Sequence, residues 1–184
     1  MSALAFDPVP SPWHVAEINI ARGRAVLTDP LMTDFVAQLE IVNRVADASG
    51  GFVWRLKADD GGASSYVRFS DDDRLIVNMS VWTSIEALQA YVYRAHDHAD
   101  VFRDRRRWFE PLDVPQLALW WVPAGHIPSL EEGRHRLALL AREGPTPRAF
   151  TFKRRFTPEE ALFVPDMTSP CSSLRLFDPF DRRR

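Results

Sequence analysis

The residues best suited to chemistry lie in two segments that alternate in polarity. WHVAEINIAR (13–22) places Glu17 and Asn19 on one side of an expected strand, and LIVNMSVW (75–82) places Asn78 and Ser80 on one side of another. Amide and hydroxyl groups can orient a carbonyl or stabilise an enolate or peroxide oxygen, and a buried carboxylate can act as a general base. These four residues are candidates for a catalytic site and, equally, for a polar network between two subunits.

A further candidate is His98, in the segment YRAHDHADVFRDRRRWFE (93–110). It shares a helical face with Phe102 and Trp108, so we expect it to point inward, either as a core histidine or as a general acid or base. His96 would diverge from it by about 200° around a continuous helix, so the two could not bind one metal ion. No Glu-x-x-His pattern or cysteine pair completes a ligand set, and we expect no metal site.

Aromatic side chains could provide the walls of a pocket for a flat ligand, although such residues more often fill a core. His126 follows two adjacent tryptophans in PAGHIP, where it could reach a pocket mouth or stabilise a turn. From the residues alone, the expected ligand-binding positions are Trp54, Ser80, Trp82, Trp108, Trp120 and His126.

The elements that would position these residues follow the order strand, helix, strand, strand, helix, strand. This order predicts an α+β fold, a ferredoxin-like split βαβ unit with an antiparallel sheet and helices on one face. The other face would hold Asn19, Asn78 and Trp82, a mixture too apolar to be left in water, so we expect a homodimer closed around a cavity. The expected organisation is an N-terminal arm (1–12), one domain (13–153) and a C-terminal extension (154–184).

Composition excludes several classes of protein. The formal net charge of −2 argues against a dedicated nucleic-acid binder, and the apolar runs are too short to span a membrane. The N-terminus does not read as a signal peptide, and Cys171 is the only cysteine, which fits a reducing cytoplasm. The sequence contains no G-x-G-x-x-G, Walker or G-x-S-x-G pattern, so nucleotide-dependent and serine-hydrolase chemistry are poorly supported.

Several segments carry a family resemblance, above all LWWVPAGHIP and GPTPRAFTF. Over roughly residues 13–153 the chain resembles a bacterial domain-of-unknown-function family (DUF3291 type) of the dimeric α+β barrel superfamily. VWTSIEALQAY is similar to the strand-to-helix junction of antibiotic biosynthesis monooxygenases. The resemblance implies a cavity for a small, often aromatic or polyketide-type, molecule of secondary metabolism. Haem-degrading relatives imply a role for Asn19 and place Tyr91 near a tryptophan position.

Three hypotheses remain. The first is a small-molecule enzyme, monooxygenase-like or an isomerase or cyclase, without a nucleotide cofactor and with His98, Asn19, Asn78 and Glu17 as catalytic residues. The second is a non-catalytic dimer that binds haem or another metabolite. The third, and weakest, is a nucleic-acid or protein-interaction module that uses the arginines of residues 103–107.

Overall fold

The computed structural model describes residues 11–59, 61–98 and 105–162, and the side chains of residues 95–98 and 105 lie outside that description. The strands are β1 (Trp13–Gly23), β2 (Phe52–Arg55), β3 (Leu75–Trp82), β4 (Phe109–Glu110) and β5 (Leu117–Pro123). The α-helices are α1 (Thr33–Asp47), α2 (Ile85–His98), α3 (Arg105–Trp108), α4 (Leu130–Glu143) and α5 (Pro158–Leu162). Two short 3-10 helices, η1 (Pro30–Met32) and η2 (Ser64–Tyr66), complete the described part.

The described strands form one antiparallel sheet around β1. Strand β1 pairs with β3 on one side and with β5 on the other, β2 pairs with the outer edge of β3, and the short β4 pairs with the end of β1. The order β2-β3-β1-β5, with α1 after β1 and α2 after β3, is that of a ferredoxin-like unit. The predicted α+β, ferredoxin-like fold is therefore confirmed, while closure of a barrel by a second chain stays a prediction.

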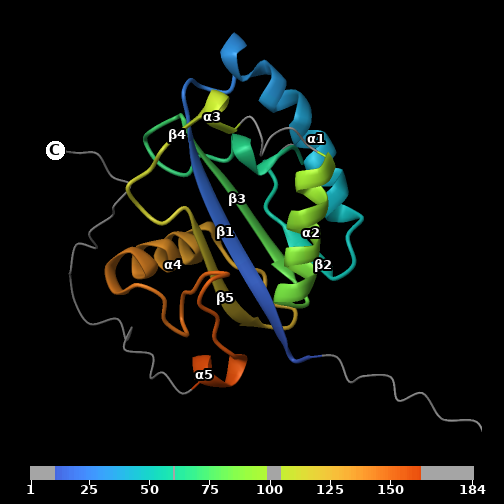
Figure 1. Ribbon diagram of the computed structural model, residues 1–184, viewed down its shortest axis with the longest axis vertical. Coiled ribbons are helices and arrows are strands. Elements are labelled where there is room, and N and C mark those ends of the chain that lie inside the picture. The colour runs from blue at the N-terminus through green and yellow to red at the C-terminus, as the bar shows by residue number, and fades with distance from the viewer. Residues whose placement is uncertain (1–10, 60, 99–104, 163–184) are drawn as a thin grey trace, which may run out of the picture.

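Helices α1 and α2 cover one face of the sheet, which we call the α1/α2 face. Ala46 of α1 and Ile85 and Leu88 of α2 pack against Val15 and Trp82 of the strands. In Figure 1 the two helices lie together beside β2 and β3. Ser84 Oγ accepts a hydrogen bond from the Ala87 backbone N–H at 3.1 Å and so caps the start of α2.

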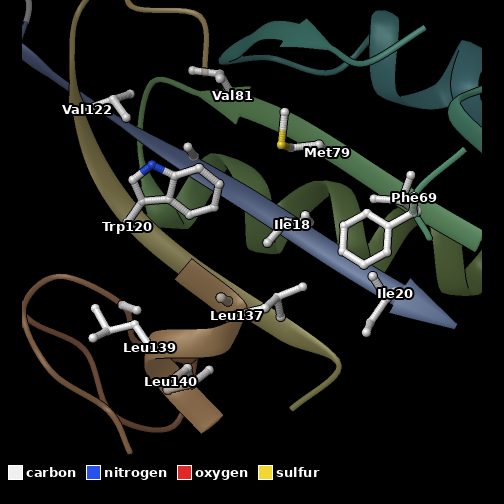
Figure 2. Close-up of a cluster of buried hydrophobic side chains, with 14 of the residues drawn as sticks. Ile18, Ile20, Phe69, Met79, Val81, Trp120, Val122, Leu137, Leu139 and Leu140 are labelled. Carbon is white, nitrogen blue, oxygen red and sulfur yellow. The ribbon is translucent and has the colours of Figure 1, made fainter. Parts of the chain in front are cut away.

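Helix α4 covers the opposite face, which we call the α4 face. Leu137, Leu139 and Leu140 of α4 pack on Ile18 and the other apolar residues of this face, as Figure 2 shows. A β-carbon added to Gly133 would lie 2.7 Å from Ile18 Cδ1, so the helix approaches the sheet closely. The expectation that the helices lie on one face only was therefore wrong, because the sequence pattern of α4 did not reveal the face on which it docks.

The expected distribution of residues between the faces was also wrong. Register places Asn19 opposite Asn78, and Trp82 packs with α1 and α2, so these residues lie beneath the helices rather than on an uncovered face. Alternation in a strand separates two sets of side chains but does not say which set the crossover helix will cover. Because helices cover both faces of the sheet, an uncovered face no longer supports the homodimer, which stays a prediction.

The C-terminal extension packs on the domain at its beginning. Phe156 lies 6.1 Å from Phe150 between ring centroids, and its carbonyl accepts a hydrogen bond from Trp121 Nε1 at 2.8 Å. The remaining extension, residues 163–184, and most of the N-terminal arm lie outside the described residues. Within the described part, no helix combines the length and apolarity needed to cross a membrane.

Candidate functional site

A row of polar residues crosses the sheet on the α1/α2 face. Ser80 of β3 lies directly opposite Glu17 of β1 on one side and Arg55 of β2 on the other. Residues directly opposed in an antiparallel pair point to the same face of the sheet. Arg55, Ser80 and Glu17 therefore form one line beneath α1 and α2, and we call it the polar row.

Glu17 is the buried acid of this row, with 5% of its surface exposed. Ser80 Oγ donates a hydrogen bond to Oε2 at 2.8 Å, and the Asn19 amide donates one to Oε1. Burial raises the pKa of Glu17 to about 6, and the hydrogen bonds from Asn19 and Ser80 oppose part of that rise. Its carboxyl group therefore exchanges a proton near neutral pH, which a general acid or base requires.

Trp82 and Tyr91 enclose the row from the side of α2. Trp82 Nε1 donates to Ser80 Oγ at 2.8 Å, and its ring stacks on Tyr91 with centroids 4.9 Å apart. Burial, followed by the negative charge of Glu17, raises the pKa of the Tyr91 phenol well above its ordinary value. Tyr91 therefore stays protonated at neutral pH and can donate a hydrogen bond beside Glu17.

Arg55 is held in place by Asp47, the last residue of α1. Its Nε and Nη2 atoms contact the two carboxylate oxygens of Asp47 at 2.9 and 3.2 Å. Both residues line a groove that runs along residues 52–57. Sequence reasoning missed this pair, although an arginine inside the apolar strand FVWRLK is itself an unusual signal.

Asn78 lies two residues before Ser80 in β3 and points to the same face. It is the cross-strand partner of Asn19, and its side-chain oxygen accepts a hydrogen bond from Ser64 Oγ at 3.2 Å. The structure thus brings together four of the predicted site residues, Glu17, Asn19, Ser80 and Trp82, in one hydrogen-bonded group and places Tyr91 and Asn78 beside it.

The other predicted ligand-binding tryptophans lie elsewhere. Trp54 and Trp120 pack with the cluster of the α4 face. Trp108 is buried with Met32, Phe35 and Ile76 in a separate cluster near the start of α1. The tryptophans expected to line one cavity therefore lie on both faces of the sheet, and only Trp82 reaches the polar row.

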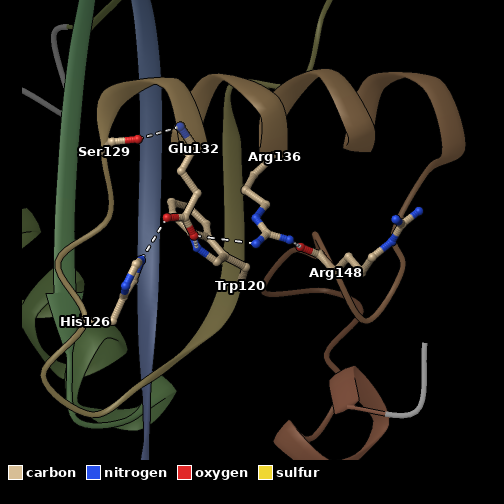
Figure 3. Close-up of polar contacts among 6 residues, drawn as sticks. All are labelled: Trp120, His126, Ser129, Glu132, Arg136 and Arg148. Atoms are coloured by element: carbon tan, nitrogen blue, oxygen red, sulfur yellow. Dashed lines mark hydrogen bonds and ion pairs between the residues drawn. The ribbon is translucent and has the colours of Figure 1, made fainter. Parts of the chain in front are cut away.

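His126 belongs to a second polar cluster, at the edge of the α4 face (Figure 3). Its Nε2 lies 2.8 Å from Glu132 Oε2, while Glu132 Oε1 accepts from Trp120 Nε1 at 2.8 Å and pairs with Arg136 at 3.5 Å. Burial favours a higher pKa for Glu132, but hydrogen bonds from His126 and Trp120 and the charge of Arg136 outweigh it and lower that pKa. This cluster fastens the loop after β5 to α4, on the far side of the sheet from Glu17.

The side chain of His98 lies outside the described residues, so its expected catalytic role stays a prediction. Three histidines have described side chains. His14 lies on β1 opposite Val122, His126 lies in the loop after β5, and His135 lies on α4. None of these three lies in the polar row, so the described residues supply no histidine ligand for haem there. The described part of the chain also contains no group of three or more histidine, cysteine, aspartate or glutamate residues arranged to hold a metal ion.

Solved structures similar to this chain were found at low sequence identity. SnoaB, a cofactor-independent oxygenase from Streptomyces nogalater, is 16% identical with a TM-score of 0.40, covering 62% of this chain and 95% of its own. NE2512, a protein of unknown function from Nitrosomonas europaea, is 10% identical with a TM-score of 0.40, covering 64% and 97%. A proposed antibiotic biosynthesis monooxygenase from Chloroflexus aurantiacus J-10-fl is 17% identical with a TM-score of 0.37, covering 64% and 98%.

No protein of curated function matches the chain. The family comparison is more extensive, because residues 14–164 match one family along nearly the whole described domain and into the C-terminal extension. The expected family resemblance is confirmed. This chain is a member of the domain-of-unknown-function family DUF3291.

Proposed function

We propose that this protein is a small-molecule enzyme that moves a proton with Glu17 and uses no nucleotide cofactor. The observation that carries the proposal is a buried carboxyl group, held by Asn19 and Ser80, whose pKa of about 6 suits proton transfer near neutral pH. The reactions that fit are monooxygenase-like chemistry and isomerisation or cyclisation of an aromatic or polyketide-type metabolite. Removal of a proton from a phenol, or from carbon next to a carbonyl, can start each of them.

The neighbours of Glu17 support this role. In its ionised form, Glu17 accepts the substrate proton, and the hydrogen bonds from Asn19 and Ser80 keep the carboxylate oriented. The protonated Tyr91 is available to donate a hydrogen bond to an oxygen that gains negative charge. The ring of Trp82, stacked on Tyr91, supplies an aromatic wall.

Proton exchange in deuterium oxide tests the proposal without knowledge of the natural substrate. A panel of enolisable aromatic ketones and phenols would be incubated with the protein, and loss of the exchanging C–H signal followed by NMR, with dissolved oxygen recorded in parallel. We expect the wild type to accelerate exchange of at least one compound. Glu17→Gln should slow that exchange by about 100-fold or more, the usual contribution of a general base.

Glu132→Gln is the matched control, because Glu132 is another glutamate held by side-chain hydrogen bonds but belongs to α4, on the opposite face of the sheet. It should leave the exchange rate unchanged. Full exchange in Glu17→Gln would refute the assigned role of Glu17. Binding of panel compounds with no exchange by the wild type would instead support the non-catalytic ligand-binding function. His98→Ala belongs in the same series, since the predicted acid or base role of His98 requires a loss of rate in a folded variant.

A further inference from the structure

Arg55 has a donor atom that the described structure leaves without a partner. Asp47 engages Nε and Nη2, whereas Nη1 is buried and has no hydrogen-bond partner among the described residues. Buried polar groups are almost always paired, and a buried guanidinium nitrogen without an acceptor is costly. An oxygen atom of a ligand would supply the missing hydrogen-bond acceptor for Nη1.

The position of Arg55 connects the groove to the polar row. The groove is lined by Asp47 and residues 52–57, while the cross-strand partner of Arg55 is Ser80, which donates to Glu17. The groove lining contains two cations, Arg55 and Lys57, and one carboxylate, Asp47, so its formal charge favours an anion. Phe52 and Trp54 add aromatic surface along the same groove.

Strand spacing gives the distance between the groove and Glu17. Arg55 and Glu17 lie on strands separated by β3. Neighbouring strands are about 4.8 Å apart, so the two backbone positions lie roughly 10 Å apart. The groove lining includes neither Glu17 nor Ser80, so a ligand in the groove meets Arg55 at the outer end of the polar row.

We propose that Arg55 binds the anionic oxygen, carboxylate or phenolate, of a flat aromatic substrate through Nη1 and so selects the substrate class. Asp47 is a positioning residue, because it fixes the guanidinium with Nη1 directed away from itself. This inference rests on the proposed function, because it assigns the substrate of that enzyme an anionic group that the groove binds. Its test measures binding alone, so the two can fail separately.

The experiment compares 2-naphthoate with 2-naphthamide, which has nearly the same shape and no charge. Each would be titrated into the full-length wild type and followed by NMR. We expect naphthoate to bind about tenfold more tightly than naphthamide, the difference that one charge-assisted hydrogen bond to Nη1 contributes. Equal binding of the two compounds, or no binding of naphthoate at about 10 mM, would overturn the proposal.

Three variants test whether the guanidinium group itself, and not only its positive charge, selects the ligand. Arg55→Gln should abolish the preference for naphthoate, and Arg55→Lys should lose most of it, because an ammonium lacks the planar fork that Asp47 orients. Arg44→Gln removes an exposed arginine of α1, paired with Glu40, and should leave the preference intact. A full preference in Arg55→Lys would show that charge alone selects the ligand and would refute the role of Nη1. Circular dichroism and thermal melting confirm that each variant is folded. If an Arg55 variant is unfolded, Asp47→Asn is titrated in its place. An unchanged preference for naphthoate in Asp47→Asn would contradict the positioning role of Asp47.

Discussion

The pKa of Glu17 makes a stability prediction that needs no substrate. In the unfolded chain the carboxyl group has its ordinary pKa of 4.5, and in the fold burial raises that pKa to about 6. Between these values the folded protein binds more protons than the unfolded chain does. Stability must therefore fall as pH rises, since ionising Glu17 beneath the helices costs more than ionising it in water.

The size of the effect follows from the shift. One pKa unit corresponds to about 1.4 kcal/mol, so a rise from 4.5 to about 6 removes about 2 kcal/mol of unfolding free energy. The neutral group contributes this stability in full below pH 4.5, and the contribution is lost once pH has risen through about 6. A glutamine in place of Glu17 would keep a similar size and would not titrate.

Chemical denaturation of the wild type and Glu17→Gln across this range measures the effect directly. Subtracting the two stabilities at each pH cancels the contributions of other titrating groups. The difference, wild type minus variant, should fall by about 2 kcal/mol from acidic to neutral pH. A flat difference would mean that the pKa of Glu17 is ordinary, and a difference that rises with pH would mean that the carboxylate is stabilised in the fold. Either result would refute the reasoning for a buried base.

Four further variants test the packing around the sheet. Ser80→Ala should lower the unfolding free energy by about 1–3 kcal/mol, because it leaves Trp82 Nε1 and one Glu17 oxygen without a partner. Ser80→Ala should also raise the pKa of Glu17 further, because it removes a hydrogen bond that lowers this pKa, and so shift the fall in stability to higher pH. An unshifted pH profile would contradict the contact between Ser80 and Glu17. Gly133→Ala should cost about 1–3 kcal/mol in a denaturant titration, since its β-carbon would lie 2.7 Å from Ile18 Cδ1 and 2.8 Å from Met79 Sδ. A higher melting temperature would show that α4 does not approach the sheet so closely. Glu132→Ala should cost about 1–3 kcal/mol by removing the acceptor of Trp120 Nε1 and the partner of His126, and His126→Ala should cost less.

Much of the fold could be predicted from local patterns. The alternation in WHVAEINIAR and LIVNMSVW predicted strands that the structure places as β1 and β3, and it grouped Glu17 with Asn19 and Asn78 with Ser80. Alternation has a period of two, so it sorts side chains between faces reliably. It carries no information about which face a helix covers, and this is why Trp82 was expected on the opposite side.

The residues missed at the site have a different cause. Arg55 and Asp47 are eight positions apart and meet only because β2 turns back along the end of α1. A single arginine in a short strand has no partner visible in the sequence, and edge strands often carry charges to prevent aggregation. The tryptophans at positions 54, 108 and 120 were misleading for a related reason, because an aromatic residue fills core as readily as it lines a pocket.

The contrast between the two faces of the sheet favours a functional origin for the polar row. On the α4 face, Ile18, Met79 and Trp120 are fully buried among apolar neighbours, and the acid at its edge, Glu132, has a pKa below its ordinary value. The same strands could have continued that apolar packing on the α1/α2 face. They instead bury Glu17 with a raised pKa and leave Arg55 Nη1 without a partner, and both features reduce stability. A buried carboxyl group with a raised pKa, held in place by several contacts, is typical of sites that act on a ligand.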